Sequence, residues 1–321
     1  MPTMRRTEML LLCALATACA APDDSDDGAA GDDGSTGTVA TTTGDTPDTD
    51  DGESTGGASD GMEEGSESSG GAAMGGCGVD PGLSGDVSGA VEIEGEERRF
   101  LLVIPEGYDP NRQYPLLFMF HGRGSNGGQF RMYNGVEEAA GSDAILVYPD
   151  ALPNAIQMGQ TGWDLTANGI DVKLVDKLLE DFTTNLCIDE ERIFATGHSH
   201  GGFFSNTLGC VRGETFRAIA PVAGGGPGMG CEGQVAAWLA HHPDDDVVPI
   251  ILGQVARDHW LETNACGEET APVDPEPCVE YQGCDEGHGV VWCEHLDDSM
   301  FGPHSWPAFA GPAIWDFFSR Y

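Results

Sequence analysis

The sequence predicts an α/β fold, in which a mainly parallel sheet is covered by helices on both faces. Short runs rich in Val, Ile, Leu and Phe recur along the second part of the chain, and segments with helical periodicity lie between them. Strands that alternate with helices are typical of a mainly parallel sheet. Residues 77–321 carry this pattern, and their length of about 245 residues suits one α/β domain.

The individual elements follow from the same periodicities. We expect strands at residues 98–105, 115–122, 144–151, 192–199, 216–224 and 235–241. The clearest helix is expected at 171–186, where one apolar stripe is formed by Val172, Val175, Leu178, Leu179 and Phe182. Further helices are expected at 201–211, 249–265 and 308–321.

Residues 1–19 have the layout of an export signal. Arg5 and Arg6 precede an apolar stretch too short to cross a bilayer, and small residues follow it. The end of this stretch resembles the lipobox of bacterial lipoproteins, with Cys19 as the lipidated residue and Ala16 where Leu is usual. We therefore expect an exported cell-surface or outer-membrane lipoprotein. The alternative is a plain cleaved signal and a secreted protein.

Residues 20–76 predict a disordered acidic tether. The segment consists largely of Asp, Glu, Gly, Ser, Thr and Ala, and it contains no Lys, Arg or aromatic residue. Such a composition cannot bury enough apolar area to offset the entropy of the chain. We expect it to separate a lipid anchor from a folded domain at residues 77–321.

The folded domain is expected to be acidic. Residues 77–321 contain 38 acidic and 12 basic residues, a formal net charge of −26 out of −40 for the whole chain. This charge argues against nucleic acid as a partner, and against a membrane contact other than the anchor at Cys19.

The cysteines also indicate export. Besides Cys13 and Cys19 in the signal region, eight cysteines remain, and an even number in an exported chain predicts disulfides. They are Cys77, Cys187, Cys210, Cys231, Cys266, Cys278, Cys284 and Cys293, and their pairing stays open. The alternative is a zinc site formed by the last four with His288 or His295, but their spacings lack the short C-x2-C pairs common in zinc sites.

Residues 197–201, Gly-His-Ser-His-Gly, match the pattern G-x-S-x-G at a predicted junction between a strand and a helix. In this pattern the serine is a nucleophile on a sharp turn, and the glycines leave room for neighbouring backbone. Ser199 is therefore the predicted nucleophile. The alternative is that His198 and His200 bind a metal, but around a tight turn they would point in different directions.

A serine nucleophile needs a histidine to accept its proton and a carboxylate to orient that histidine. Both are expected after the serine, the acid first, in loops that follow later strands. The acid is expected among Asp244, Asp245 and Asp246, and the base is expected to be His304, just before the last helix. His288 and His295 are alternative bases, but they are expected to be surface or packing residues.

Two backbone N–H groups should hold the oxyanion that forms on the carbonyl group. One is that of His200, directly after the nucleophile. The other is expected in residues 118–128, where a buried strand runs into a glycine-rich loop. We predict the Arg123 N–H as the second donor, with Gly124 as the alternative.

Four segments resemble those of one esterase family. They are FHGRGSNG (120–127), TGHSHGG (196–202), HHPDDDVVP (241–249) and PHSWP (303–307). They are similar to segments of the exported feruloyl esterases, acetylxylan esterases and polyhydroxyalkanoate depolymerase-like esterases of carbohydrate esterase family one. The resemblance covers residues 77–321, including the cysteine-rich block at 278–293, and implies an α/β-hydrolase fold.

The resemblance also bears on single residues. The family's acid loop, H-G-x-x-D-x-x-V-P, places the acid at Asp245, but His242 stands in place of its glycine, so Asp244 and Asp246 stay open. The family's H-x-W-P matches residues 304–307 and implies that Trp306 lies near bound substrate. Trp163, in TGWDL, is a further candidate for substrate contact.

Together these residues predict a serine esterase. Ser199 would attack an ester carbonyl, His304 would accept the Ser199 proton, and Asp245 would orient His304 before water hydrolyses the acyl-enzyme. This chemistry requires no metal or organic cofactor.

The resemblance implies feruloyl or acetyl esters of plant polysaccharide as substrates. Polyhydroxyalkanoate-like polyesters are the alternative, and a small soluble ester fits equally well. Two other classes stay open: a tethered binding protein without activity, which the presence of nucleophile, acid and base disfavours, and a metal-dependent hydrolase.

Overall fold

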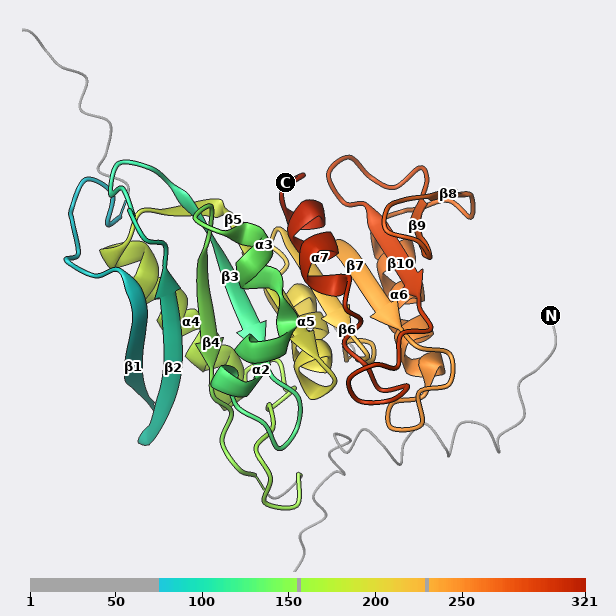
Figure 1. Cartoon of the computed structure of the whole chain (residues 1–321), viewed down its shortest axis with the longest axis horizontal. Coiled ribbons are helices and arrows are strands. Elements are labelled where there is room, and N and C mark those ends of the chain that lie inside the picture. Colours follow the sequence, from blue (N-terminus) through green and yellow to red (C-terminus); the bar gives the residue numbers. More distant parts are fainter. Residues whose placement is uncertain (1–74, 155–156, 229–230) are drawn as a thin grey trace, which may run out of the picture. The chain divides into compact units, whose positions relative to one another are not determined.

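Figure 1 shows a computed structural model of the chain, which describes residues 75–154, 157–228 and 231–321. The predicted export signal, the lipobox and all but the last two residues of the predicted tether lie outside these ranges. Gly76 N donates a hydrogen bond of 2.9 Å to Thr183 O, so the folded domain includes the residue before Cys77. In the described part of the chain, no helix combines the length and the apolar character needed to cross a membrane.

The described residues form one ten-stranded sheet (Figure 1). Its strands lie in the order β1-β2-β4-β3-β5-β6-β7-β10-β9-β8. Neighbouring strands pair in parallel from β4 to β10, and antiparallel pairs flank this block on both sides. The strands are β1 (Gly85–Ile93), β2 (Glu96–Ile104), β3 (Tyr114–Phe120), β4 (Ile145–Pro149), β5 (Ile188–His198), β6 (Ala218–Val222), β7 (Ala236–His241), β8 (Thr270–Pro272), β9 (Cys278–Tyr281) and β10 (Val290–Glu294).

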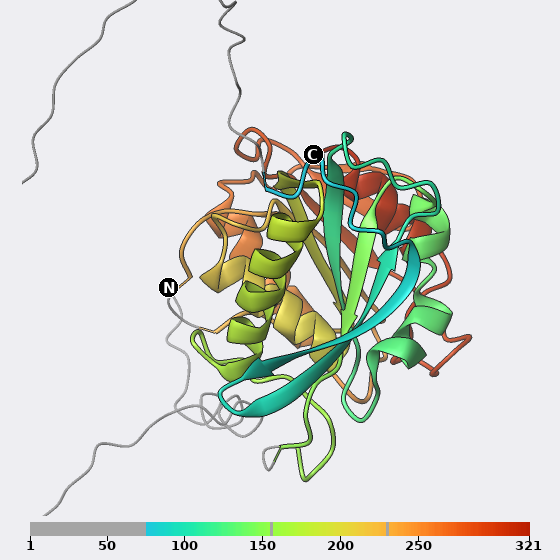
Figure 2. The same ribbon diagram turned by 90° about the vertical axis from the view of Figure 1, so that its left-hand side faces the viewer.

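Helices cover both faces of the sheet (Figures 1 and 2). One face carries α2 (Gly127–Asn134), α3 (Val136–Ala140) and α7 (Ala310–Phe318), and the other carries α4 (Ile170–Asn185), α5 (His200–Val211) and α6 (Ile250–Thr263). Side chains of each strand alternate between two cores. In β3, Phe118 packs in the core under α4, α5 and α6, and Leu117 packs in the core under α2, α3 and α7. Burial on both faces explains why β3 is apolar throughout.

The structure confirms the predicted fold, with all six predicted strands and all four predicted helices present at shifted ends. One expectation was wrong: residues 278–293 are not only a cysteine-rich insert. They contain β9 and most of β10, and β10 pairs in parallel with β7 in the middle of the core. Glycines and cysteines around the short run Val290–Trp292 obscure its strand pattern. The sequence analysis also did not predict β1, β8, α2 and α3.

All eight remaining cysteines form disulfides. The pairs are Cys77–Cys187, Cys210–Cys231, Cys266–Cys284 and Cys278–Cys293. The zinc alternative was therefore wrong, because its four cysteines are bonded to one another. Disulfides form and persist in oxidising compartments, so the domain has the character of an exported protein.

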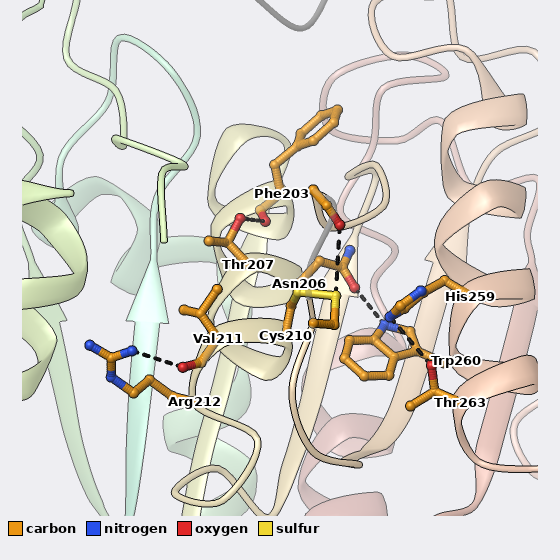
Figure 3. The surroundings of a disulfide bond; sticks show 11 residues. Phe203, Asn206, Thr207, Cys210, Val211, Arg212, His259, Trp260 and Thr263 are labelled. Carbon is orange, nitrogen blue, oxygen red and sulfur yellow. Dashed lines mark hydrogen bonds between the residues drawn. A yellow bond between two sulfur atoms is a disulfide. The ribbon is translucent and has the colours of Figure 1, made fainter. Parts of the chain in front are cut away.

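The helix after the predicted nucleophile is held from two sides (Figure 3). The disulfide of Cys210 ties the end of α5 to Cys231. The fully buried Asn206 donates to Gly225 O over 2.7 Å and accepts from Trp260 Nε1 over 2.8 Å. Asn206 thereby joins α5 to α6 and to the loop after β6, which fixes the backbone behind the turn that holds Ser199.

Candidate active site

The candidate residues gather at one edge of the sheet. Arg123, Ser199, Asp245 and His304 follow β3, β5, β7 and β10 respectively. These strands are parallel, so their carboxyl ends lie at the same edge, the lower one in Figure 1. Crevices at this edge are the usual ligand sites of open α/β sheets.

Ser199 occupies a strained turn between β5 and α5. Its backbone has φ 56° and ψ −118°, a region that residues other than glycine rarely adopt. The two glycines of the motif are required because a side chain at either position would clash with backbone atoms. A Cβ atom at Gly201 would lie 2.1 Å from Phe120 O, and one at Gly197 would lie 2.5 Å from Gly201 C. The turn therefore presents Ser199 at the end of the strand.

The structure separates the three candidate acids. Asp244 and Asp246 are exposed, whereas the Asp245 side chain is fully buried and its Oδ2 lies 2.7 Å from His304 Nδ1. Asp245 Oδ1 accepts hydrogen bonds from the N–H groups of Val247 and Val248, at 2.9 and 2.8 Å. Only Asp245 is placed to orient His304.

The surroundings of Asp245 keep it ionised. Burial alone would raise its pKa, but hydrogen bonds from His241, His304 and the Val248 N–H outweigh burial and hold the pKa of Asp245 well below its usual range. The His241 contact is the longest of these, with Nε2 3.3 Å from Asp245 Oδ2 and 2.7 Å from Val248 O. We therefore assign the main hydrogen bond of the His241 Nε2 proton to Val248 O. Its longer contact with Asp245 Oδ2 is the weaker of the two.

His304 lies against the residue that precedes the nucleophile. Its ring stacks on that of His198 with centroids 5.1 Å apart. His198 Nδ1 lies 3.1 Å from the Tyr133 hydroxyl. Since Nδ1 of His304 faces Asp245, its Nε2 is the atom free to exchange protons.

The two alternative bases lie elsewhere. His295 is buried against His242, and His288 follows a turn that begins at Asp285.

The glycine-rich loop after β3 lies beside Ser199. A Cβ atom at Gly122 would come within 3.4 Å of the Ser199 Cβ. Ser125 N donates to Gly122 O over 3.2 Å, and Gly124 has φ 74°, which together make residues 122–125 a type II turn with Arg123 in its second position. The Gly124 N–H was the alternative second oxyanion donor. It already donates a hydrogen bond of 2.9 Å to Thr161 O.

Trp163 and Trp306 are built into the interior. Each is 2% exposed, so neither presents a surface on which a substrate could lie in this structure. Trp163 Nε1 donates to His121 O over 2.8 Å, and Trp306 Nε1 donates to Asn134 O over 3.0 Å. Both rings therefore hold carbonyl groups of neighbouring segments, and their predicted contact with substrate stays a prediction.

His198 and His200 do not converge on a common point. His200 Nδ1 accepts from Trp163 N over 3.0 Å, whereas His198 faces Tyr133. Within residues 75–154, 157–228 and 231–321, no group of three or more His, Cys, Asp and Glu side chains is arranged to hold a metal ion. The two histidines therefore contact different partners within the protein, His198 the Tyr133 hydroxyl of α2 and His200 the backbone at Trp163.

Comparison with known proteins gives the family. No protein-family model matches the chain. Feruloyl esterase D of Neurospora crassa is 33% identical over 269 residues, which cover 77% of this chain and 90% of that protein. Feruloyl esterase C of Emericella nidulans is 32% identical over 260 residues, which cover 76% and 90%.

This chain belongs to the feruloyl esterase family. It is a carboxylic ester hydrolase with an α/β-hydrolase fold. The fold agrees with solved structures of low sequence identity. Acetyl xylan esterase from Aspergillus awamori has a TM-score of 0.58 at 12% identity and covers 72% of this chain and 99% of its own. A ferulic acid esterase of Anaeromyces mucronatus has a TM-score of 0.50 at 17% identity and covers 74% and 89%.

The structure adds residues to the candidate site that sequence reasoning missed. His121 Nε2 accepts from Ala151 N over 3.0 Å, so Nδ1 carries the proton and donates to Gly122 O over 2.7 Å. This bond sets the orientation of the Gly122–Arg123 peptide. His121 and His241 each lie in a segment that carried the family resemblance, which was the available signal. Tyr133 had none, because α2 itself was not predicted.

Buried neutral histidines are expected to make the stability of this protein depend on pH. Burial lowers the pKa of His198 to about 3 and those of His200 and His295 to about 4. Each folded pKa lies below the unfolded value, so the unfolded chain binds more protons between the two values. Stability is then full above about pH 6.5 and falls as the pH falls through this window. We expect each residue to cost up to about 1.4 kcal/mol of unfolding free energy per pH unit.

Urea unfolding at pH 7 and pH 5 measures this loss. His295→Leu is the matched variant, because both ring nitrogens of His295 are buried without a hydrogen-bond partner among the described residues. The variant should lose less stability than the wild type over the same pH interval. An equal loss in both proteins would show that His295 is not one of the titrating groups.

Proposed function

We propose that this protein hydrolyses feruloyl esters of plant polysaccharide through a triad of Ser199, His304 and Asp245. The observation that carries the proposal is the contact of the buried Asp245 with His304, 2.7 Å apart, at the same sheet edge as a serine in a strained turn. The names of the relatives, feruloyl esterase C and D, support feruloyl as the acyl group.

The proposed reaction begins when Ser199 Oγ attacks the ester carbonyl carbon and passes its proton to His304 Nε2. The tetrahedral intermediate collapses, the bond to the alcohol oxygen breaks, and His304 returns the proton to that oxygen. Water then repeats the sequence on the acyl-enzyme and releases the free acid. Asp245 stays ionised throughout and stabilises the His304 imidazolium, in keeping with its low pKa.

The function is tested with purified, oxidised protein on three esters. We expect the largest kcat/KM for methyl ferulate, a smaller one for 4-nitrophenyl acetate, and little turnover of a methyl-capped 3-hydroxybutyrate dimer. A preference for the hydroxybutyrate ester would move the protein to the polyester-hydrolysing class. Folded protein with no turnover of any ester would remove the catalytic proposal and favour a binding protein.

Arg123 tests the oxyanion assignment, because the proposed donor is its backbone N–H and not its side chain. Proline has no N–H, and it is favoured in the second position of a type II turn, where Arg123 lies. Arg123→Pro should therefore keep the turn and remove one donor. We expect kcat on methyl ferulate to fall by about 10²- to 10³-fold.

Arg123→Ala is the control, since it removes the side chain and keeps the N–H group. It should stay within about threefold of the wild type, because the Arg123 side chain has no place in the proposed chemistry. Equal losses in Arg123→Ala and Arg123→Pro would assign the effect to the guanidinium and overturn the proposed donor.

A further inference from the structure

The aromatic side chains of the described part of the chain are buried or half-buried, with one exception. Of all its Phe, Tyr and Trp residues, Phe301 alone is exposed, at 49%. It lies in the loop after β10, three residues before His304. Two other large apolar side chains of this loop, Leu296 and Met300, are also exposed. A group of exposed apolar side chains in one loop, beside the proposed catalytic histidine, is a candidate binding surface, since exposed apolar patches often mark such surfaces.

Phe301 is connected to the catalytic histidine through two ring contacts. Its ring stacks on that of His198, with centroids 5.7 Å apart and an interplanar angle of 25°. His198 in turn stacks on His304 at 5.1 Å. The Tyr133 ring makes T-shaped contacts with both rings, and its centroid lies 5.3 Å from that of Phe301 and 5.9 Å from that of His198. Phe301 therefore packs on this group of rings beside His304 and still leaves about half of its surface open to solvent.

The chemistry of ester cleavage decides which part of a substrate meets this surface. The carbonyl oxygen must turn toward the N–H groups of His200 and Arg123, on the side where Gly122 approaches Ser199. The alcohol oxygen must turn toward His304, because that residue protonates it as it leaves. A surface on the His304 loop therefore lies on the side of the alcohol, away from the oxyanion donors.

We propose that Phe301 is a platform for the sugar ring of the leaving alcohol, and that it makes this protein selective for esters of sugars over esters of small alcohols. The C–H groups on the face of a furanose or pyranose ring are apolar and carry a slight positive charge, so they pack well on the negative face of an aromatic ring. The inference rests on the proposed function and names the alcohol part of its substrate.

The test compares two esters of the same acid. 5-O-Feruloyl-L-arabinofuranose carries a sugar as its alcohol, whereas methyl ferulate carries none. For Phe301→Ala we expect kcat/KM on the sugar ester to fall about tenfold, and that on methyl ferulate to stay within about twofold of the wild type. Phe301→Tyr keeps an aromatic face and should retain turnover of both esters.

Leu83→Ala is the matched control. Leu83 is 45% exposed and precedes β1, at the edge of the sheet opposite the candidate site. It should change neither reaction. The Tm of each variant shows whether it is folded, and little change is expected because both side chains are exposed.

Two outcomes would overturn the platform while leaving the proposed function intact. Equal losses of Phe301→Ala on both esters would place the ring against the feruloyl group, and no loss on either would leave Phe301 without a part in binding. In both cases wild-type turnover of methyl ferulate stands. A wild type that cleaves neither ester would instead remove the proposed function, and the platform with it.

Discussion

Replacing Ser199 with alanine is expected to lower kcat on methyl ferulate by about 10⁴- to 10⁶-fold, the largest effect of any single substitution in this protein. The reason is that no other hydroxyl lies in the strained turn, so the covalent step cannot begin. The donors of the oxyanion and the binding surface stay in place and account for what remains. The measurement is the release of ferulic acid, followed over hours at high enzyme concentration.

Ser205→Ala is the matched control, one to two turns further along the same helix. Ser205 is fully buried, and its Oγ donates to Gly201 O over 2.9 Å, so the variant removes one hydrogen bond behind the turn. We expect a loss of about 1 kcal/mol in stability and turnover within about tenfold of the wild type. If Ser199→Ala kept as much activity as Ser205→Ala, Ser199 would not be the nucleophile.

Asp245→Asn is expected to lower kcat by about 10⁴-fold at neutral pH. The N–H groups of Val247 and Val248 would hold the asparagine oxygen where they now hold Oδ1. The amide NH₂ would then face Nδ1 of His304, which now lies 2.7 Å from Asp245 Oδ2. Two donors cannot bond to each other, so the imidazole must change its tautomer and present a proton to Ser199 where it should accept one.

The neighbouring aspartates provide the comparison. Asp244→Asn and Asp246→Asn change the same charge in the same loop, but both side chains are exposed. We expect them to keep kcat within about twofold of the wild type, since exposed charges contribute little. A large loss in either variant, with normal turnover by Asp245→Asn, would reassign the acid.

The local parts of this site were predictable from sequence because short-range sterics determine them. Gly197 and Gly201 are required by backbone atoms within a few ångströms, so the turn that carries Ser199 appears as a motif in consecutive residues. The alternation of apolar runs with helical segments likewise reflects burial of each element, and it predicted the parallel sheet. His304 followed from the order of loops along the chain, since parallel strands bring their carboxyl ends to one edge.

Other features depend on packing between distant segments. In the run Asp244 to Asp246 the family resemblance favours Asp245 but leaves its two neighbours open. The structure separates them through His304, which lies 59 residues further along the chain and contacts Asp245. The burial of Trp163 and Trp306 is a second example, because the carbonyl acceptor of each Nε1 comes from a distant segment of the chain.

The sequence by itself determined the class of fold, the strained turn at Ser199 and the oxidised state of the cysteines, because each depends on residue type and on neighbours within a few positions. The tertiary structure decided the pairing of the disulfides, the place of β10 in the core, the burial of Asp245 against His304 and the exposure of Phe301. Each of these is a contact, or the lack of one, between segments far apart in the chain. Such contacts are selected by the shape of the assembled core, which no local pattern contains.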